Sequence, residues 1–377
     1  MNEVKKNKIY LSLAKVSSWT GLSRIFGLIR DVVTTNLLGA SVFHDIFVVT
    51  LKIPNLFRRF FAEGAFNQAF IPIYSDYQKG NDEKNTQEFI NSLAGTFLSI
   101  LFLFTILVLL ITPIFIFIFA PGFYYDDSKR IIAIDLLRIM FPYLALISLV
   151  SFASGIQNTH EKFSIPAFTP LIFNITLIVA AIFIAPIINL PVYALAWGVL
   201  IAGFLQLLIH IYALKNINRL PTPKINFSHP GQINVLKLMI PAILAGGIVQ
   251  INLLIDTIFA SLLQTGSPTW LYVSDRLIQF PMGIFAIAIG TILLPTLSKI
   301  DVATNKKLFI HELQKGQRFV LFIGIPSLIG LYLCSIDLIG TIFFRGEFTA
   351  YDVQQASLQI HTKRSCTRRQ SSLHARQ

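Results

Sequence analysis

The chain has 377 residues, of which 54% are hydrophobic and only 13% are charged. Soluble domains are about one-quarter charged, so this composition excludes an ordinary soluble protein and indicates an all-α polytopic membrane protein. The net charge of +12 does not indicate nucleic-acid binding, because the basic residues lie in short loops and within apolar segments instead of one solvated patch. No leader peptide is expected, because the N-terminus enters the first apolar segment without a cleavage site.

Nine apolar segments are long enough to cross a bilayer, which takes about 20 residues per helix. In chain order they are Leu11–Leu38, Val42–Ile73, Phe89–Ala120, Ile131–Gln157, Pro166–Ile187, Pro191–Leu214, Ile233–Leu263, Trp270–Leu297 and Leu308–Ser335. A short interfacial piece is expected at Ile336–Phe344, and a tenth helix is expected to begin at Ala350. The sequence therefore predicts nine to ten transmembrane helices.

The loops and a faint internal repeat predict the topology. With the N-terminus in the cytoplasm, about twelve basic loop residues fall on the cytoplasmic side and about three on the other. At an offset of roughly 225 residues, Gly21 and Asp31 align with Gly246 and Asp256, as in transporters built from two parallel halves. A cytoplasmic N-terminus and two similarly oriented halves are therefore expected.

Charged residues lie inside three predicted spans, although each costs on the order of 3 kcal/mol at the bilayer centre. They are Arg24, Arg30, Asp31, Asp45, Lys52, Arg58, Arg59, Glu63, Asp275 and Arg276. Asp45, Lys52 and Arg59 recur every seven residues, so they share one helix face. Salt bridges such as Asp31 with Arg24 could simply hold helices together, but basic residues outnumber acidic ones in this set. The surplus requires an anionic partner that the protein does not supply.

Guanidinium groups suit bidentate binding of phosphate, so the pattern predicts a water-filled, arginine-lined cavity for a phosphorylated substrate. The third, fifth and sixth predicted spans are almost uncharged and are expected to be scaffold without a site. The scattered histidines lack metal-ligand spacing, and there is no Walker A motif, so neither an enzyme nor a cofactor or metal is expected. Transport would then depend on a gradient, including coupling to a monovalent ion, or on the membrane potential.

Three stretches resemble one known family: GLSRIFGLIRD, HDIFVVTLKIPNLFRRFFAEGAFNQAFIPIYSDY and VSDRLIQFPMGIFAIAIGTILLPTLSK. They closely resemble the MurJ (MviN) family of bacterial lipid II flippases, within the multidrug/oligosaccharidyl-lipid/polysaccharide flippase superfamily. The run PNLFRRFFAEGAF is the most specific part, and the resemblance extends from about Lys5 to Gln355.

The resemblance implies two six-helix lobes around a cavity, followed by two further helices. It implies transport of lipid II, the undecaprenyl-diphosphate-linked disaccharide-pentapeptide of peptidoglycan, from the inner to the outer leaflet of the bacterial cytoplasmic membrane by alternating access. Cavity arginines of the family match Arg24, Arg30, Arg58, Arg59 and Arg276, and the charge pattern adds Lys52. Family positions for gating or charge partners match Asp31, Asp45, Glu63 and Asp275.

The chain departs from the family at its end. Family members have fourteen spans, whereas the match stops inside the tenth, and the last residues are polar and basic. The expected organisation is a complete N-terminal lobe over residues 1–218, a truncated second lobe over 219–358 and an aberrant tail over 359–377. A change of reading frame would make the chain an inactive fragment, and a genuine basic tail is the alternative.

Three other functions compete with the lipid II flippase. A flippase for another polyprenyl-diphosphate-linked sugar would use the same arginines. A cation-coupled antiporter on the same scaffold would use acidic sites, for which Asp31, Asp45 and Asp256 are candidates. A membrane scaffold without transport would tolerate neutralisation of the charged stripe.

Overall fold

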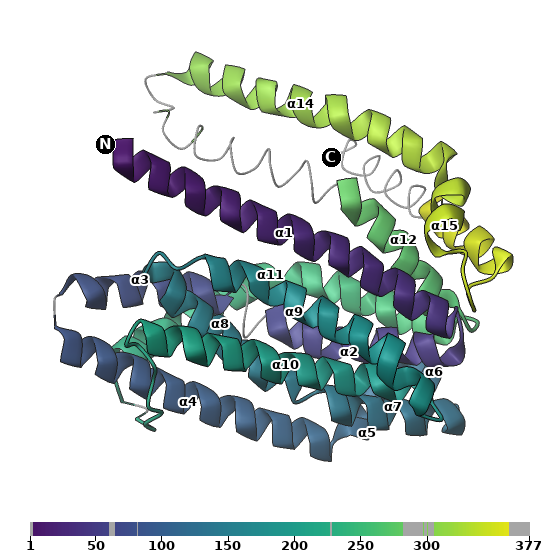
Figure 1. The fold of residues 1–377 in the computed structure, drawn as a ribbon, viewed down its shortest axis with the longest axis horizontal. Coiled ribbons are helices and arrows are strands. Elements are labelled where there is room, and N and C mark those ends of the chain that lie inside the picture. Colours follow the sequence, from purple (N-terminus) through teal and green to yellow (C-terminus); the bar gives the residue numbers. More distant parts are fainter. Residues whose placement is uncertain are drawn as a thin grey trace, which may run out of the picture. The chain divides into compact units, whose positions relative to one another are not determined.

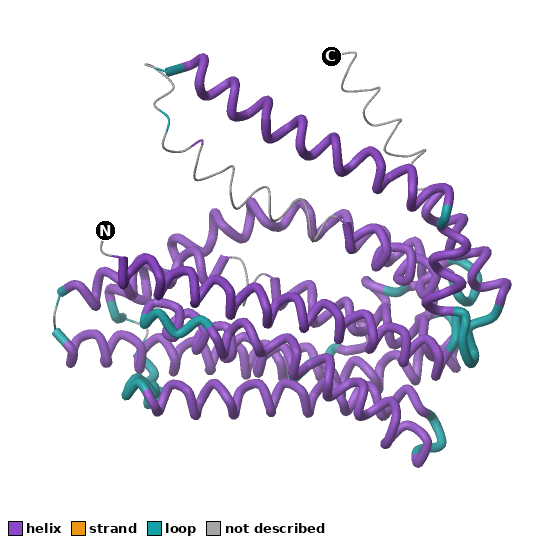
Figure 2. Tube along the Cα trace, turned by 45° about the horizontal axis from the view of Figure 1, so that its top comes forward, coloured by secondary structure: helices purple, strands orange, loops and turns teal. Residues whose placement is uncertain are grey.

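The computed structural model describes residues 3–59, 65–80, 82–226, 228–281, 297, 300 and 305–361 (Figure 1). Every regular element within these ranges is helical, as predicted, and most of the loops between helices are short (Figure 2). The chain divides into two compact units, Met1–Pro268 and Thr269–Gln377. The predicted lobe boundary at residue 218 stays a prediction. It was based on the internal repeat, whereas the compact units are separated by their packing.

The first unit contains most of the helices. In order they are α1 (Glu3–Leu38), α2 (Val42–Arg58), α3 (Ala65–Lys79), α4 (Glu83–Leu110), α5 (Thr112–Phe119), α6 (Pro121–Tyr124), α7 (Asp127–Met140), α8 (Tyr143–Thr159), α9 (Ser164–Val179), the π-helix η2 (Ala180–Ile184), the 3-10 helix η3 (Ala185–Ile187), α10 (Pro191–Asn216) and α11 (Pro230–Leu262). Helix α12 (Ser267–Pro281) starts at its end. The second unit contains most of α12, α14 (Lys306–Leu333), α15 (Ser335–Phe343) and a helix at 350–361, where a tenth helix was predicted.

Five helical stretches of the described residues are long and apolar enough to cross a membrane. They are Glu83–Leu110, Asp127–Thr159, Ser164–Ile187, Pro191–Asn216 and Lys306–Leu333. The polytopic class is therefore supported, while the predicted number of nine to ten spans stays a prediction.

Prolines divide two of the predicted spans. The span predicted at 89–120 consists of α4 and α5, which meet at Ile111 just before Pro113. The span predicted at 131–157 consists of α7 and α8, which meet around Pro142. Proline has no N–H to donate and its ring clashes with the preceding turn, so each helix ends there. Of the span predicted at 42–73, residues 60–64 lie outside the described residues.

Short polar side chains cap the N-termini of several helices. The Ser41 hydroxyl accepts the His44 N–H at the start of α2, and an Asp82 carboxylate oxygen accepts the Asn85 N–H at the start of α4. An Asp126 carboxylate oxygen likewise accepts N–H groups in the first turn of α7. Such caps satisfy donors that have no partner inside the helix, and they fix where each helix starts.

Two apolar clusters form the core of the first unit. One includes Ile46 of α2 and Leu144 of α8, both fully buried. The other is rich in aromatic residues from α3 and α4, including Phe66 and Phe97, whose stacked rings lie 4.8 Å apart. Helix α1 packs along α9, as Figure 1 shows.

The linker between α10 and α11 is fixed to α4. The Lys224 N–H donates to the Asn91 carbonyl at 3.0 Å, and the Thr222 N–H donates to Asn91 Oδ1 at 2.8 Å. A Cβ atom placed on Gly95 would lie 2.3 Å from the Lys224 carbonyl oxygen, so the absence of a side chain permits the contact. Residues 217–226 therefore follow the surface of α4 closely.

Candidate substrate-binding site

Arg24 borders a groove of about 520 Å³ in the first unit. Thr20 and Ser23 line the groove from α1, Asn158 lines it from α8 and Pro170 lines it from α9. Arg24 is exposed, and among the described residues it has no acidic partner. Its guanidinium is therefore available to an anion that enters the groove.

Arg30 lies two turns further along α1 and is buried. Its Nε donates to Asp31 Oδ1 at 2.9 Å, and its Nη1 donates to Asn174 Oδ1 of α9 at 3.0 Å. The guanidinium carbon lies 5.7 Å from the centre of the Phe173 ring. The structure brings Arg30 and Asp31 together, whereas the bridge considered from the sequence joined Asp31 to Arg24. The substrate-binding role of Arg30 stays a prediction.

Asp45 is 2% exposed at the start of α2. Its Oδ2 accepts the N–H of Gly266 at 2.6 Å, in the turn between α11 and α12. Gly266 has a φ of 97°, a conformation that residues with side chains rarely adopt. Shortly before Gly266 in the chain, Ser261 Oγ of α11 accepts the N–H of Gly122 of α6 at 3.3 Å. These two contacts join helices of the predicted first lobe to the end of α11.

The predicted stripe on α2 passes from buried to exposed. Asp45 is buried, Lys52 is half-buried and Arg59 is exposed. Arg59 Nη1 donates to Gln250 Oε1 of α11 at 3.0 Å. Arg58 beside it is half-buried. The exposed end of the stripe therefore carries the arginines.

Two of the remaining predicted residues lie in the second unit, and one lies outside the described residues. Asp275 and Arg276 are half-buried on α12. Arg276 Nη2 donates to the Tyr272 hydroxyl at 3.1 Å, and its guanidinium carbon lies 5.0 Å from the centre of the Tyr272 ring. The tyrosine therefore orients this arginine. Glu63 lies outside the described residues.

Asn174 was missed by the sequence analysis, which assigned no site to the fifth predicted span. It is 6% exposed on α9 and contacts both Arg30 and Ser23 of α1. A signal was present, because Asn174 is the single amide side chain between Pro166 and Ile187. An isolated amide in an apolar span is costly unless it has a partner on another helix.

His160 lies outside the membrane-spanning segments, in the loop between α8 and α9. Its Nε2 lies 3.0 Å from the Tyr74 hydroxyl and 2.9 Å from Gln78 Nε2, so the ring joins this loop to α3. Burial lowers the pKa of His160, and the positive charges of Arg219 and Lys162 lower it further. The lowered pKa favours the neutral imidazole, and Nε2 acts as an acceptor because the Gln78 amide nitrogen can only donate.

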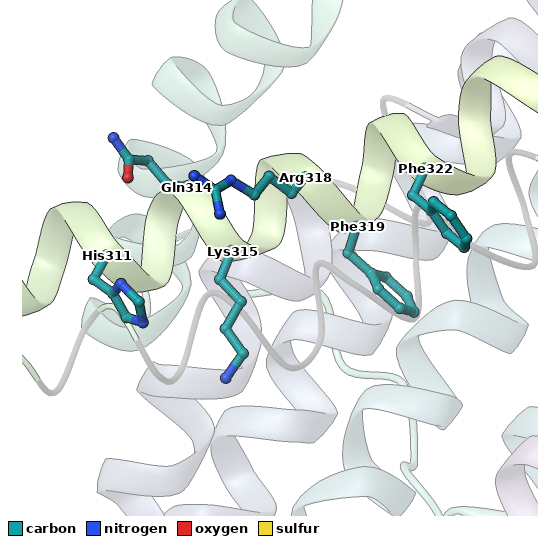
Figure 3. Close-up of a pocket in the computed structure, with 6 residues that line it drawn as sticks. All are labelled: His311, Gln314, Lys315, Arg318, Phe319 and Phe322. Carbon is teal, nitrogen blue, oxygen red and sulfur yellow. The ribbon is translucent and has the colours of Figure 1, made fainter.

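A second groove, of about 560 Å³, runs beside α14 in the second unit (Figure 3). His311, Lys315 and Phe319 project to the same side of the helix in Figure 3, with Phe322 one turn further along. Basic groups followed by aromatic rings are typical of a helix that enters a membrane from a headgroup layer. None of these residues belongs to the arginine set selected from the sequence.

The sequence matches the model of the family described as lipid II flippase MurJ over residues 34–361. The chain belongs to the MurJ family. A probable lipid II flippase MurJ of Vibrio cholerae is 40% identical over 352 residues, which cover 92% of this chain and 67% of the relative. A probable lipid II flippase MurJ of Haemophilus influenzae is 40% identical, with 90% of this chain and 69% of the relative covered. The lipid II flippase MurJ of Burkholderia cenocepacia is 36% identical, with 94% and 69% covered.

Solved structures agree with this MurJ assignment. A lipid II flippase MurJ in an inward closed conformation superimposes with a TM-score of 0.77 at 30% identity, covering 91% of this chain and 70% of that one. An inward-facing multidrug resistance transporter of the MATE family, within the MOP superfamily, superimposes with a TM-score of 0.64 at 12% identity, covering 90% and 76%. The second likeness shows the fold alone. The resemblance found in the sequence motifs is therefore confirmed at the level of the family and its superfamily fold.

Proposed function

We propose that this chain is a lipid II flippase that moves undecaprenyl-diphosphate-linked disaccharide-pentapeptide from the inner to the outer leaflet of the bacterial cytoplasmic membrane. The observation that carries the proposal is Arg24, an exposed guanidinium beside a groove of about 520 Å³ in a chain of the MurJ family. A diphosphate offers several oxygens to a planar guanidinium, so charge-assisted hydrogen bonds would hold the headgroup there.

The remaining charges take supporting roles in the proposal. Arg59, which is exposed beside α11, would add to the diphosphate contacts of the first unit. In the second unit, Arg276, which Tyr272 orients, is proposed as a substrate-binding residue by its charge. Lys52 and Arg58 would raise the positive potential near Arg59, at the C-terminal end of α2. The acidic residues Asp31, Asp45, Glu63 and Asp275 would act as charge or gate partners during the cycle.

Alternating access requires an outer end that closes and opens. The bond from Gly266 N–H to Asp45 and the bond from Gly122 N–H to Ser261 lie at the same end of the first unit as the α11–α12 turn. With the N-terminus in the cytoplasm, this end would face outward, and breaking these bonds would open it. The proposed organisation keeps a first lobe over residues 1–218 and a partial second lobe over 219–358.

The membrane potential can drive the proposed step. A diphosphate that moves outward carries negative charge away from a negative interior, which favours export by roughly 2.3 kcal/mol per charge for every 100 mV. No covalent chemistry is needed, and coupling to a monovalent ion is compatible with the same scaffold.

The competing functions have less support. An antiporter would need acidic groups open to a cation. Asp31 is engaged by Arg30 and Asp45 by the Gly266 N–H, whereas Asp256 is exposed on α11, so only one of the three candidates meets this need. A flippase for another diphosphate-linked sugar would share the arginines, but the family match favours lipid II.

The test uses bacteria depleted of their own lipid II flippase and expressing this chain. The arrival of lipid II at the outer leaflet is measured with an external enzyme that cleaves it. The unmodified chain should restore exposure of lipid II, and Arg24→Ala should abolish it. Lys79→Ala serves as the matched control, because within the described part of the chain Lys79 pairs only with exposed Asp76 on α3. Full activity of Arg24→Ala, or no activity of the unmodified chain when it is present in the membrane, would overturn the proposal.

A further inference from the structure

Asn174 makes contacts to α1 at two points. Its Nδ2 donates to the Ser23 carbonyl at 2.9 Å, and its Oδ1 accepts Arg30 Nη1 at 3.0 Å. Ser23 and Arg30 are seven residues apart, so they lie on the same face of α1 two turns from each other. One side chain of α9 therefore fixes two turns of α1.

The orientation of this amide follows from its partners. A guanidinium only donates and a backbone carbonyl only accepts, so the amide oxygen must face Arg30 and the nitrogen must face Ser23. Gly27 lies between the two contacts, and a Cβ placed on it would lie 3.5 Å from Asn174 Nδ2. The small residue at this position lets the amide lie against the backbone of α1.

The same stretch of α1 lines one side of the groove. Ser23, whose carbonyl Asn174 holds, directly precedes Arg24, and both residues line the groove. About one turn before Ser23, Trp19 Nε1 donates to Ser164 Oγ of α9 at 3.2 Å. The segment of α1 that presents Arg24 is therefore held at both ends by α9.

We infer that Asn174 is a positioning residue for substrate binding. It fixes the rotation and depth of α1, so that Arg24 faces the groove while Arg30 stays in its buried pair with Asp31. This inference rests on the proposed function, because the bound group is the diphosphate assigned to Arg24. An amide that served packing alone would affect stability without affecting the placement of the groove.

Three variants separate these roles. Asn174→Leu removes both contacts and keeps the same branching and number of side-chain heavy atoms. Asn174→Asp keeps an acceptor for Arg30 but, as a carboxylate, has no donor for the Ser23 carbonyl. Thr176→Val is the matched control on the same helix, because among the residues that the structure describes the Thr176 hydroxyl bonds only the Ile172 carbonyl of α9 itself.

The first measurement reports the position of α1 without using transport. Spin labels are placed at Thr20→Cys of α1 and Ala167→Cys of α9, which both line the groove, in a background with Cys334→Ser and Cys366→Ser. Dipolar broadening in continuous-wave spectra, which measures the short separations between labels on neighbouring helices, should give a narrow distance distribution in the parent and in Thr176→Val. The distribution should broaden in Asn174→Leu and change partly in Asn174→Asp.

The second measurement is the affinity of the same variants, without labels, for purified lipid II in detergent. Asn174→Leu loses a bond to the charged Arg30 and a neutral bond to the Ser23 carbonyl, and it should weaken binding by about tenfold. Asn174→Asp loses only the neutral bond, and it should weaken binding by about threefold. Thr176→Val should leave affinity unchanged. If Asn174→Leu does not fold, the comparison of Asn174→Asp with Thr176→Val still decides.

The outcomes are distinguishable. Broadened distances together with weakened binding support the inference. Unchanged distances, or changed distances with normal affinity, overturn it and leave the proposed function intact. A parent chain that binds no lipid II overturns the proposed function and the substrate half of this inference, while the distances still report whether Asn174 places α1.

Discussion

At the scale of single residues, burial separates the charges of α1 into two kinds. Arg24 is exposed beside its groove, whereas Arg30 is 9% exposed and Asp31 is 1% exposed. A buried ion pair contributes little net stability, but removing one partner leaves a charge without compensation. The two arginines therefore respond differently to mutation.

Asp31→Asn should lower the free energy of unfolding by about 3–5 kcal/mol, because the Arg30 guanidinium loses its carboxylate in a buried site. Thermal unfolding of the purified protein in detergent measures the loss. Asp76→Asn is the control, because its pair with Lys79 is exposed and should add little stability. Equal unfolding temperatures for the two variants would contradict a structural role for the Arg30–Asp31 pair.

His160 gives a residue-scale prediction for pH. Burial and the charges of Arg219 and Lys162 depress its pKa in the folded protein, while the unfolded chain binds a proton near the ordinary value of about 6.5. Between these two pKa values the unfolded state binds more protons. The free energy of unfolding therefore has its full value above about pH 6.5 and decreases as the pH falls below it. His160→Gln should flatten the decrease in unfolding temperature between about pH 7.5 and 5.5, and His311→Gln on exposed α14 should not. A slope that His160→Gln leaves unchanged would refute the assignment.

At the scale of elements, the sequence predicts apolar helices well and their interruptions poorly. The sixth span was expected at Pro191–Leu214, and α10 covers Pro191–Asn216. The breaks at Ile111 and Pro142 were not predicted, because proline within an apolar run is compatible with a kink as well as with a new helix. Which outcome holds depends on packing against neighbouring helices, and that is not contained in local composition.

The same limit applies to the candidate site. The cost of charge in a membrane singled out Arg24, Arg30 and Asp31 from the sequence. It could not show that Arg30 is buried against Asp31 and Asn174 while Arg24 is exposed, because Asn174 lies on a different helix. The spacing of residues along one helix shows which of them share a face. Pairing between helices depends on the three-dimensional fold.

The contact between the linker and α4 supports an element-scale prediction. Gly95→Ala places a Cβ where the Lys224 backbone lies, so the linker must move away from α4. Trypsin should then cut faster after Arg219 and Lys224, which mass spectrometry of the fragments would show. Gly324→Ala on α14 is the matched control, because nothing lies within 4 Å of a Cβ added there. Equal cleavage rates in both variants would mean that the linker is not held at Gly95.

At the scale of the whole molecule, the proposed cycle depends on contacts made with the end of α11. Gly122 permits close approach of α6, since an added Cβ would lie 1.8 Å from the Ser261 carbonyl oxygen. Ser261 is 4% exposed in this arrangement. Separation of α6 from α11 would therefore uncover a residue that is now hidden.

Gly122→Ala should favour the separated arrangement. In a background with Cys334→Ser and Cys366→Ser, a cysteine at Ser261→Cys should react slowly with a membrane-impermeant maleimide added outside cells, and severalfold faster when Gly122→Ala is added. Gly330→Ala, where an added Cβ meets nothing within 4 Å, should not change the rate. A rate that is insensitive to Gly122→Ala would argue against an opening at this contact.

The anchored linker has a consequence for protein engineering. Connections between helices are usual places for inserting a reporter domain or for splitting a chain, because free backbone tolerates both. Here Thr222 and Lys224 use their backbone N–H groups to bind Asn91, so an insertion would break these bonds. A fluorescent reporter should be better tolerated near Gly80, which is exposed at the end of α3.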